Sequence, residues 1–203
     1  MLKSFLDKNK IEAGVDEAGR GCLAGPVFAA AVILPKNFRH KLLNDSKQVK
    51  EKDREKLREI IIEESVAWAV AFCNQKKIDK INILNASFKA MNEAIFRLRK
   101  QPQHLLIDGN RFKNETEYAY TCIIKGDGKY KSIAAASILA KTFRDDFMRK
   151  IDLEFPQYNW KQNKGYGTLH HREMIRQHGA CVYHRRSFDL LGDGGQLSLF
   201  EKK

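Results

Sequence analysis

The chain has 203 residues, the length of one globular domain with at most a short extension. Hydrophobic residues make up 43% of it and charged residues 31%, a balance that is typical of folded proteins and excludes an intrinsically disordered chain. The 37 Lys and Arg residues outnumber the 25 Asp and Glu residues, which leaves a formal net charge of +12. This surplus favours a polyanionic partner, with nucleic acid ahead of an anionic membrane surface.

Three features exclude other classes of protein. The longest apolar run, residues 26–35, is too short to span a bilayer, and residues 1–11 are too polar for a secretory signal. The four cysteines are scattered, and no two of them have the spacing of metal ligands or of a redox pair. We therefore expect a cytoplasmic protein with reduced thiols and without structural zinc.

Apolar periodicity predicts a series of strands and helices in chain order. The predicted strands are residues 11–15, 27–34, 65–73, 105–107 and 118–124. The predicted helices are residues 50–64, 83–98 and 133–148, followed by a basic region that is helical or irregular. Strands that come first and then alternate with helices indicate an α/β fold built on one mixed five-stranded sheet with flanking helices.

Acidic residues follow three of the predicted strands. Asp16 and Glu17 end the first strand, Asp108 ends a central strand, and Asp127 follows the next one. Ligands of such sheets gather at strand ends, although each acid taken singly is more often an ordinary solvated turn residue. Adjacent residues of a strand face opposite ways, so Asp16 and Glu17 converge only if the strand breaks after them.

Four carboxylates brought together would repel one another and would have raised pKa values, and divalent cations remove that penalty. Ligands that are all oxygen suit Mg²⁺ or Mn²⁺ rather than zinc or copper. Two such ions clamp an in-line displacement at phosphorus. A basic protein with an acidic metal pocket is thus suited to cutting nucleic acid.

Residues 19–24 also match a loose dinucleotide-binding pattern, G-x-G-x-x-A. That motif needs a helix to follow, whereas Pro26 and a β-branched run follow here. The bare backbone of this segment is better suited to close approach by a sugar or a phosphate.

Eight segments of the chain resemble ribonuclease HII, the type 2 ribonuclease H. The opening segment, residues 14–21, reads Gly-Val-Asp-Glu-Ala-Gly-Arg-Gly. The others are residues 23–27, 43–47, 107–110, 125–127, 132–141, 164–168 and 184–188, in the family's order. The resemblance implies a ribonuclease H-like fold and a four-carboxylate site that binds Mg²⁺ or Mn²⁺. By motif match these carboxylates are Asp16, Glu17, Asp108 and Asp127.

The resemblance also implies the reaction. It is endonucleolytic hydrolysis on the 5′ side of a ribonucleotide, in RNA–DNA hybrids or in duplex DNA, leaving a 3′-hydroxyl and a 5′-phosphate. Gly19, Arg20 and Gly21 would sense the 2′-hydroxyl through backbone groups. Tyr166 would stack on the sugar at the RNA–DNA junction, and its flanking glycines favour a loop over a core position. The implied role is ribonucleotide removal during DNA replication and repair.

Ser46 and Lys47 precede the helix predicted over residues 50–64. The resemblance implies that this segment contacts the substrate backbone, and a helix N-terminus with a lysine favours phosphate. The alternative for Ser46 is a plain N-cap. Two departures from the family pattern are visible: Cys22 stands where many relatives have proline, and Gly128 and Tyr130 vary the stretch after Asp127.

The C-terminal third is basic from residue 161 to residue 186, with aromatic residues interleaved, as duplex and junction binding requires. We expect a catalytic domain over residues 1–191 and a flexible tail over residues 192–203. The tail resembles the motif by which bacterial repair proteins bind the sliding clamp. Its apolar anchors and polar contact would be Leu197, Leu199, Phe200 and Gln196, unless the tail folds back or frays.

The sequence therefore predicts a monomeric, metal-dependent ribonuclease H. The alternative from another class is a non-catalytic nucleic-acid-binding adaptor tethered to the clamp, which leaves the strand-end acids unexplained. A second rival, ribonuclease HIII, usually carries an extra N-terminal domain. Only residues 1–13 precede the first matching segment here, which favours ribonuclease HII.

Overall fold

The computed structural model describes residues 2–43 and 49–192, and its centre is one sheet. The strands are β1 (Glu12–Ala18), β2 (Val27–Ile33), β3 (Ala67–Cys73), β4 (His104–Asp108) and β5 (Ala119–Ile123). Their order across the sheet is β3-β2-β1-β4-β5. The first three strands are antiparallel, and β4 and β5 add in parallel to β1. The predicted mixed five-stranded sheet is confirmed.

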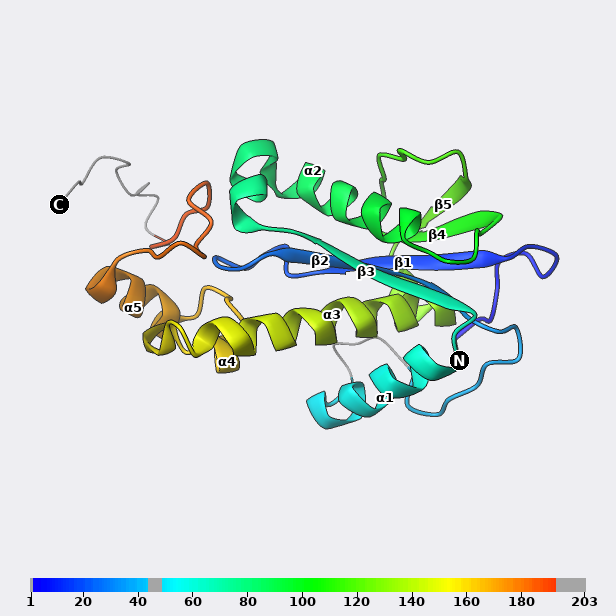
Figure 1. Cartoon of the computed structure of the whole chain (residues 1–203), viewed down its shortest axis with the longest axis horizontal. Helices are drawn as coiled ribbons and strands as arrows, with labels where there is room; N and C mark the ends of the chain where they lie inside the picture. Colours follow the sequence, from blue (N-terminus) through cyan, green and yellow to red (C-terminus); the bar gives the residue numbers. More distant parts are fainter. Residues whose placement is uncertain (1, 44–48, 193–203) are drawn as a thin grey trace.

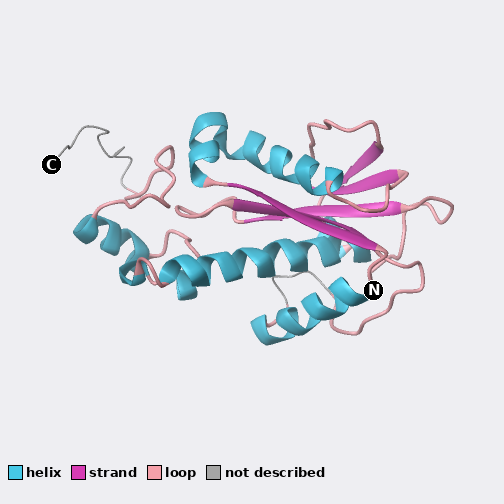
Figure 2. Cartoon of the chain, viewed as in Figure 1, coloured by secondary structure: helices cyan, strands magenta, loops and turns pink. Residues whose placement is uncertain are grey.

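Helices cover both faces of this sheet (Figures 1 and 2). The longer helices are α1 (Glu51–Glu64), α2 (Gln75–Phe96), α3 (Lys131–Asp152) and α5 (Leu169–His178). Shorter turns are η1 (Gly126–Gly128), η2 (Pro156–Tyr158) and α4 (Trp160–Asn163). One face packs against α2, and the other packs against α3 and α1. No helix within the described ranges is long and apolar enough to cross a membrane.

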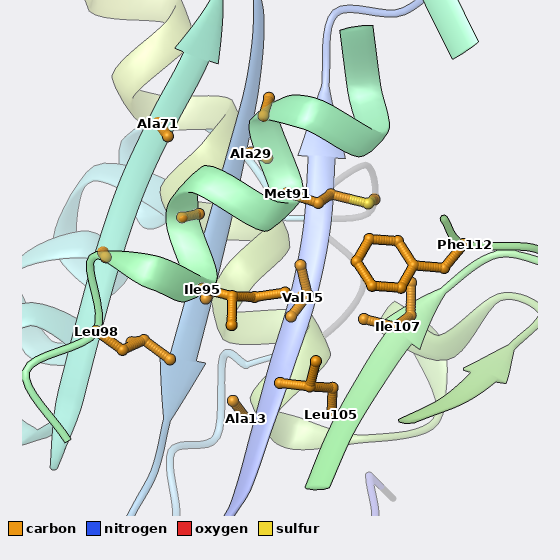
Figure 3. Packing of buried hydrophobic residues seen from close by; sticks show 14 of the residues in the cluster. Ala13, Val15, Ala29, Ala71, Met91, Ile95, Leu98, Leu105, Ile107 and Phe112 are labelled. Carbon is orange, nitrogen blue, oxygen red and sulfur yellow. The ribbon is translucent and has the colours of Figure 1, made fainter. Parts of the chain in front are cut away.

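The alternation of β1 decides which of its side chains face which helix. Ala13 and Val15 belong to the core beneath α2, where Val15 lies beside Ile107 of β4 and near Met91 of α2 (Figure 3). Gly14, which lies between them, faces α3. A Cβ at Gly14 would lie 2.1 Å from the backbone of Ser132, so the glycine lets β1 and α3 approach closely. The same period of two carries the acids that follow to opposite faces.

Two elements differ from the prediction. Strand β1 does not end at the acids but continues through them to Ala18, because residues 14–18 remain paired with β2. Helix α2 begins at Gln75 rather than at residue 83, and Asn82 interrupts it with a left-handed φ of 62°. The predicted start at residue 83 therefore marks the second half of a broken helix.

The region after α3 forms a small core of its own. Leu23 and Met148 contribute to it from the main domain, and Tyr158, Trp160 and Ile175 contribute from the C-terminal part. Helices α4 and α5 lie beyond the C-terminal end of α3, at one end of the molecule (Figure 1). A basic helical C-terminal region was expected, and α5 carries Arg172 and Arg176.

Candidate active site

Asp16 is a buried carboxylate in the middle of the sheet. It lies on β1 with 5% of its surface exposed and faces α3, where the Ser137 hydroxyl donates a hydrogen bond to it. The backbone N–H of Glu17 donates a second hydrogen bond at 2.6 Å. Burial raises the pKa of Asp16 well above its ordinary value, and the nearby charges of Glu17 and Asp108 raise it further.

Glu17 lies on the opposite face of β1 and points toward α2. Its carboxylate pairs with the Arg20 guanidinium at 3.0 Å. Burial raises the pKa of Glu17; Arg20 opposes this shift, and the charge of Asp108 adds to it. Glu17 and Asp108 line one hollow of about 290 Å³, together with Met91 of α2.

Asp108 is the last residue of β4, the strand next to β1. Its carboxylate accepts a hydrogen bond from the backbone N–H of Gly126 at 2.6 Å. This bond ties the end of β4 to η1, which carries Asp127. Asp127 is buried, and it accepts a hydrogen bond from the N–H of Gly128 at 3.0 Å.

The structure thus brings Asp16, Glu17 and Asp108 within electrostatic reach of one another. Asp127 directly follows Gly126, whose N–H Asp108 binds. Across residues 2–43 and 49–192, no three Asp, Glu, His or Cys side chains are arranged as a ready-made metal site. The reason is the unbroken strand β1, which sends Asp16 and Glu17 to opposite faces. Joint ligation of metal by all four carboxylates stays a prediction.

The donor set nevertheless fits a hard divalent cation. Every candidate ligand atom is a carboxylate oxygen, the type that Mg²⁺ and Mn²⁺ prefer. Asp16 is buried beside two other carboxyl groups, and only hydrogen bonds from Ser137 and from a backbone N–H offset the repulsion. A bound cation would supply the positive charge that this buried cluster needs.

The loop of residues 19–21 follows β1 directly, and the side chain of a buried arginine binds its backbone carbonyl groups. Arg185 is fully buried and donates to the carbonyl oxygens of Gly19 at 2.7 Å, Arg20 at 2.8 Å and Gly25 at 2.9 Å. These three bonds use the planar geometry of the guanidinium. They fix the backbone of the predicted substrate-sensing loop.

A second buried arginine, Arg144 of α3, holds the next part of the chain. It donates to the carbonyl oxygens of Pro26 at 3.1 Å, Ala24 at 3.2 Å and Lys164 at 2.8 Å. Gly19 has a φ of +93°, and a Cβ there would lie 2.0 Å from Arg144 Nε. This position therefore needs glycine both for its backbone and for its contact.

Tyr166 lies beside this loop. Its backbone pairs with that of Cys22 in an isolated bridge, and its phenol hydrogen-bonds with the Cys22 thiol. The side chain is 46% exposed, so it is not a core tyrosine. Burial of the remaining part raises the pKa of the phenol. Tyr166 thus lies beside Cys22, the residue that follows the loop of residues 19–21.

Some predicted site residues lie outside the described ranges. These are Ser46 and Lys47 and the tail residues Gln196, Leu197, Leu199 and Phe200. Helix α1 begins at Glu51 with Lys50 in the N-cap position, and Lys50 makes no side-chain capping bond.

Two aromatic residues of the C-terminal third are not available to nucleic acid. Tyr158 and Trp160 are buried and stack on each other with ring centroids 5.0 Å apart. Arg172 and Arg176 donate to carbonyl oxygens of the C-terminal segment. The interpretation of Tyr158 and Trp160 as stacking rings for nucleic acid is wrong, because both build the small C-terminal core. Arg176 stays exposed, and its contact with phosphate stays a prediction.

Sequence reasoning also missed Arg144, which is buried on α3. A signal was present: Arg144 lies four residues after Ala140 and four before Met148, on the apolar stripe of its helix. A charge on such a stripe is buried only when it has partners, here three carbonyl oxygens. Lys141 is paired with Asp145.

Comparison with known proteins decides the family. The family model for ribonuclease HII matches residues 13–191. A ribonuclease HII of Bacteroides fragilis is 63% identical over 202 residues, which cover all of both chains. The chain belongs to the ribonuclease HII family. It is accordingly an enzyme, a metal-dependent endoribonuclease of the ribonuclease H type, and the adaptor alternative is wrong.

Solved structures agree with this membership. A ribonuclease H2 from Pyrococcus horikoshii has a TM-score of 0.74 at 26% identity, covering 89% of this chain and 94% of that one. The ribonuclease HII of Archaeoglobus fulgidus, solved in a complex with PCNA, has a TM-score of 0.69 at 26% identity, covering 82% and 87%. The ribonuclease H-like fold expected from the sequence is confirmed.

Proposed function

We propose that this enzyme cleaves the phosphodiester on the 5′ side of ribonucleotides, in RNA–DNA hybrids and in duplex DNA with embedded ribonucleotides. The products would carry a 3′-hydroxyl and a 5′-phosphate. One observation carries the proposal: the loop of residues 19–21 follows β1, the strand that carries Asp16 and Glu17, with only Ala18 between them. Recognition of the sugar and cleavage would therefore take place side by side. The role would be removal of ribonucleotides from DNA in the cytoplasm.

The carboxylates of Asp16, Glu17, Asp108 and Asp127 would hold two Mg²⁺ or Mn²⁺ ions. When bound, such ions supply an activated water and stabilise charge on the leaving oxygen. Ser137 keeps the Asp16 carboxylate oriented toward the site through its hydroxyl. The Gly126 N–H does the same for Asp108.

Backbone donors of the loop would read the 2′-hydroxyl. All described peptide bonds are trans, so the carbonyls that point toward Arg185 send the following N–H groups of Arg20 and Gly21 the opposite way. Neither N–H has a hydrogen-bond partner within the described parts of the chain. The space beyond Gly21 is open, since a Cβ there would meet nothing within 4 Å. Two unpaired donors, one of them at a residue with open space beside it, support recognition of a sugar oxygen.

Tyr166 would stack on the sugar at the junction, beside the same loop. Its half-exposed ring and its contacts with Cys22 support this role. Ser46 and Lys47 would contact the substrate backbone. With residues 1–191 forming the catalytic domain, the tail at 192–203 would bind the sliding clamp through Gln196, Leu197, Leu199 and Phe200, and the enzyme would act as a monomer. The archaeal ribonuclease HII solved with PCNA supports the clamp proposal.

The experiment is to map the cut on a 5′-labelled duplex that carries one ribonucleotide. A DNA duplex of the same sequence and an RNA–DNA hybrid serve as comparison substrates. We expect a single nick directly 5′ to the ribonucleotide, a product end that a polymerase extends, and no cutting of the DNA duplex. A cut on the 3′ side, or an end that is not extended, would contradict the proposal.

A further inference from the structure

Three segments meet behind the proposed substrate loop. The segment of residues 22–25 lies between two others, and backbone hydrogen bonds join it to both. Leu23 N–H donates to Gly165 at 2.8 Å, on the side of Tyr166. On the other side, Gly25 N–H donates to Tyr183 at 2.9 Å, and Arg185 N–H donates to Leu23 at 2.8 Å. The segment of Arg185, which holds the loop, and the segment of Tyr166, which flanks it, are therefore both hydrogen-bonded to the backbone of residues 22–25.

A pair of buried histidines joins the segment of Tyr166 to the segment of Arg185. His171 of α5 has 0% of its surface exposed and His184 has 2%. Their Nε2 atoms lie 3.2 Å apart. His171 Nδ1 lies 2.8 Å from the carbonyl oxygen of Tyr166, and His184 is adjacent in sequence to Arg185. The imidazoles thus connect the Tyr166 loop to the segment of Arg185.

The partners fix the tautomer of each ring. The Trp160 indole N–H is only a donor, and it donates to His171 Nε2 at 2.9 Å, so this nitrogen carries no proton. The proton of neutral His171 is therefore on Nδ1 and is donated to Tyr166. Likewise the Cys181 N–H donates to His184 Nδ1 at 3.0 Å, which leaves the His184 proton on Nε2, directed at His171.

Both rings are neutral in this arrangement. Burial lowers the pKa of His184 to about 3, and the neighbouring His171 adds to the shift. Burial also lowers the pKa of His171. A proton added to either ring would set two N–H groups against each other, at Trp160 or at Cys181. The hydrogen-bonded chain is therefore held in one direction, from His184 to His171 to Tyr166.

We propose that His171 is a positioning residue for Tyr166 in cleavage at a ribonucleotide, and that Trp160 and His184 hold it in the required tautomer. The proposal rests on the proposed junction role of Tyr166. Since the Tyr166 carbonyl is the acceptor, loss of the Nδ1 donor lets the loop shift relative to residues 19–21. Displacement of a positioned group by about 1 Å costs up to about 100-fold in rate.

Two amide variants separate the contacts of His171. His171→Asn puts an N–H donor near the place of Nδ1, so it keeps the bond to Tyr166 and loses the acceptor for Trp160. His171→Gln puts an amide oxygen near the place of Nε2, so it keeps the bond from Trp160 and loses the one to Tyr166. His171→Asn removes the hydrogen bonds from Trp160 and His184, whereas His171→Gln removes only the one to Tyr166. Thermal unfolding checks that both variants are folded.

The test is the single-turnover nicking rate at one ribonucleotide, with enzyme in saturating excess. We expect His171→Asn to stay within about threefold of the wild-type rate and His171→Gln to fall by at least about tenfold. In a Tyr166→Ala background, His171→Gln should have no further effect, because residues that act through one another are not additive.

Each outcome decides between the proposals. Wild-type rate in Tyr166→Ala removes the junction role of Tyr166, and the positioning role falls with it. A slow Tyr166→Ala variant with equal rates for the Asn and Gln variants overturns the positioning role alone, as does a multiplicative loss in the double variant. Imidazole ¹⁵N spectra give an independent readout: His171 should be neutral with its proton on Nδ1 at pH 6, and a proton on Nε2 contradicts the proposal.

Discussion

The carboxylate of Asp108 accepts a hydrogen bond from the backbone N–H of Gly126 at 2.6 Å, across 18 residues of sequence. This one bond joins the end of β4 to the turn that carries Asp127. It gives Asp108 two separable roles, since the hydrogen bond needs an oxygen acceptor whereas a metal ion needs the negative charge.

Asp108→Asn and Asp108→Ala should separate these roles. The Asn side chain keeps an oxygen for Gly126, so we expect a thermal midpoint close to that of the wild type. The Ala variant leaves that N–H without its partner and should lose about 1–3 kcal/mol of unfolding free energy. Both should fail to nick. Equal stability of the two variants in thermal denaturation would show that the hydrogen bond from Gly126 does not stabilise the fold.

Asp16 should make the metal-free protein less stable at neutral pH. Its pKa is raised in the folded state, so the folded protein binds more protons than the unfolded chain once the pH falls below the raised value. The destabilisation is full above the raised pKa, declines as pH falls through it, and is absent below the ordinary value near 3.8. In EDTA, Asp16→Asn should therefore raise the melting temperature at pH 8 more than at pH 4. A gain that is the same at both pH values would contradict the raised pKa.

His184 has the opposite pH dependence. Its pKa falls from 6.5 to about 3 on folding, so between these values the unfolded chain binds more protons and stability decreases as the pH falls. The charged neighbour Arg186 lowers the pKa of His184, and Arg172 and His170 lower that of His171. The slope should reach about 1.4 kcal/mol per pH unit for His184. His184→Asn keeps an acceptor for Cys181 without titrating.

Urea denaturation from pH 7 to pH 4 measures this slope. The wild type should lose stability more steeply than His184→Asn across that range. Parallel curves for the two proteins would mean that His184 titrates with an ordinary pKa in the folded state.

Two glycines of the proposed substrate loop should respond differently to alanine. Gly19→Ala brings a Cβ to 2.0 Å from Arg144 Nε and strains a φ of +93°, so it should lower both the melting temperature and the nicking rate. Gly21→Ala meets nothing within 4 Å and should keep its melting temperature. It should still nick at least about tenfold more slowly, because its methyl group projects into the space proposed for the sugar. Wild-type nicking by Gly21→Ala would remove the loop from substrate recognition.

Much of the fold could be predicted because it depends on local patterns. The continuous apolar run of residues 27–34 and the apolar stripe of residues 133–148 are strong signals, and β2 and α3 lie where they indicate. The boundary of β1 was less accurate. The acids and glycines of residues 16–21 predict the end of a strand, whereas pairing with β2 extends β1 through Asp16 and Glu17.

The supporting residues of the site could not be predicted in the same way. Arg185 binds carbonyl oxygens about 160 residues away, and Arg144 binds others about 120 residues away. The His171 tautomer depends on Trp160 and His184 together. Such contacts arise only when separate segments are packed, so no local spacing reports them. The acids could be identified because their position after strands is a local pattern of the sequence. The residues that support the site could not be identified in this way.

The most direct test of the carboxylate site compares nicking with binding in Asp16→Asn. The substitution preserves the shape and removes the charge, and Glu63→Gln, on an exposed position of α1, is the matched control. On a duplex with one ribonucleotide and Mg²⁺ or Mn²⁺, Asp16→Asn should nick at least about 100-fold more slowly and bind the duplex within about threefold of the wild type. The control should match the wild type in both measurements. Nicking by Asp16→Asn at near the wild-type rate would contradict the account.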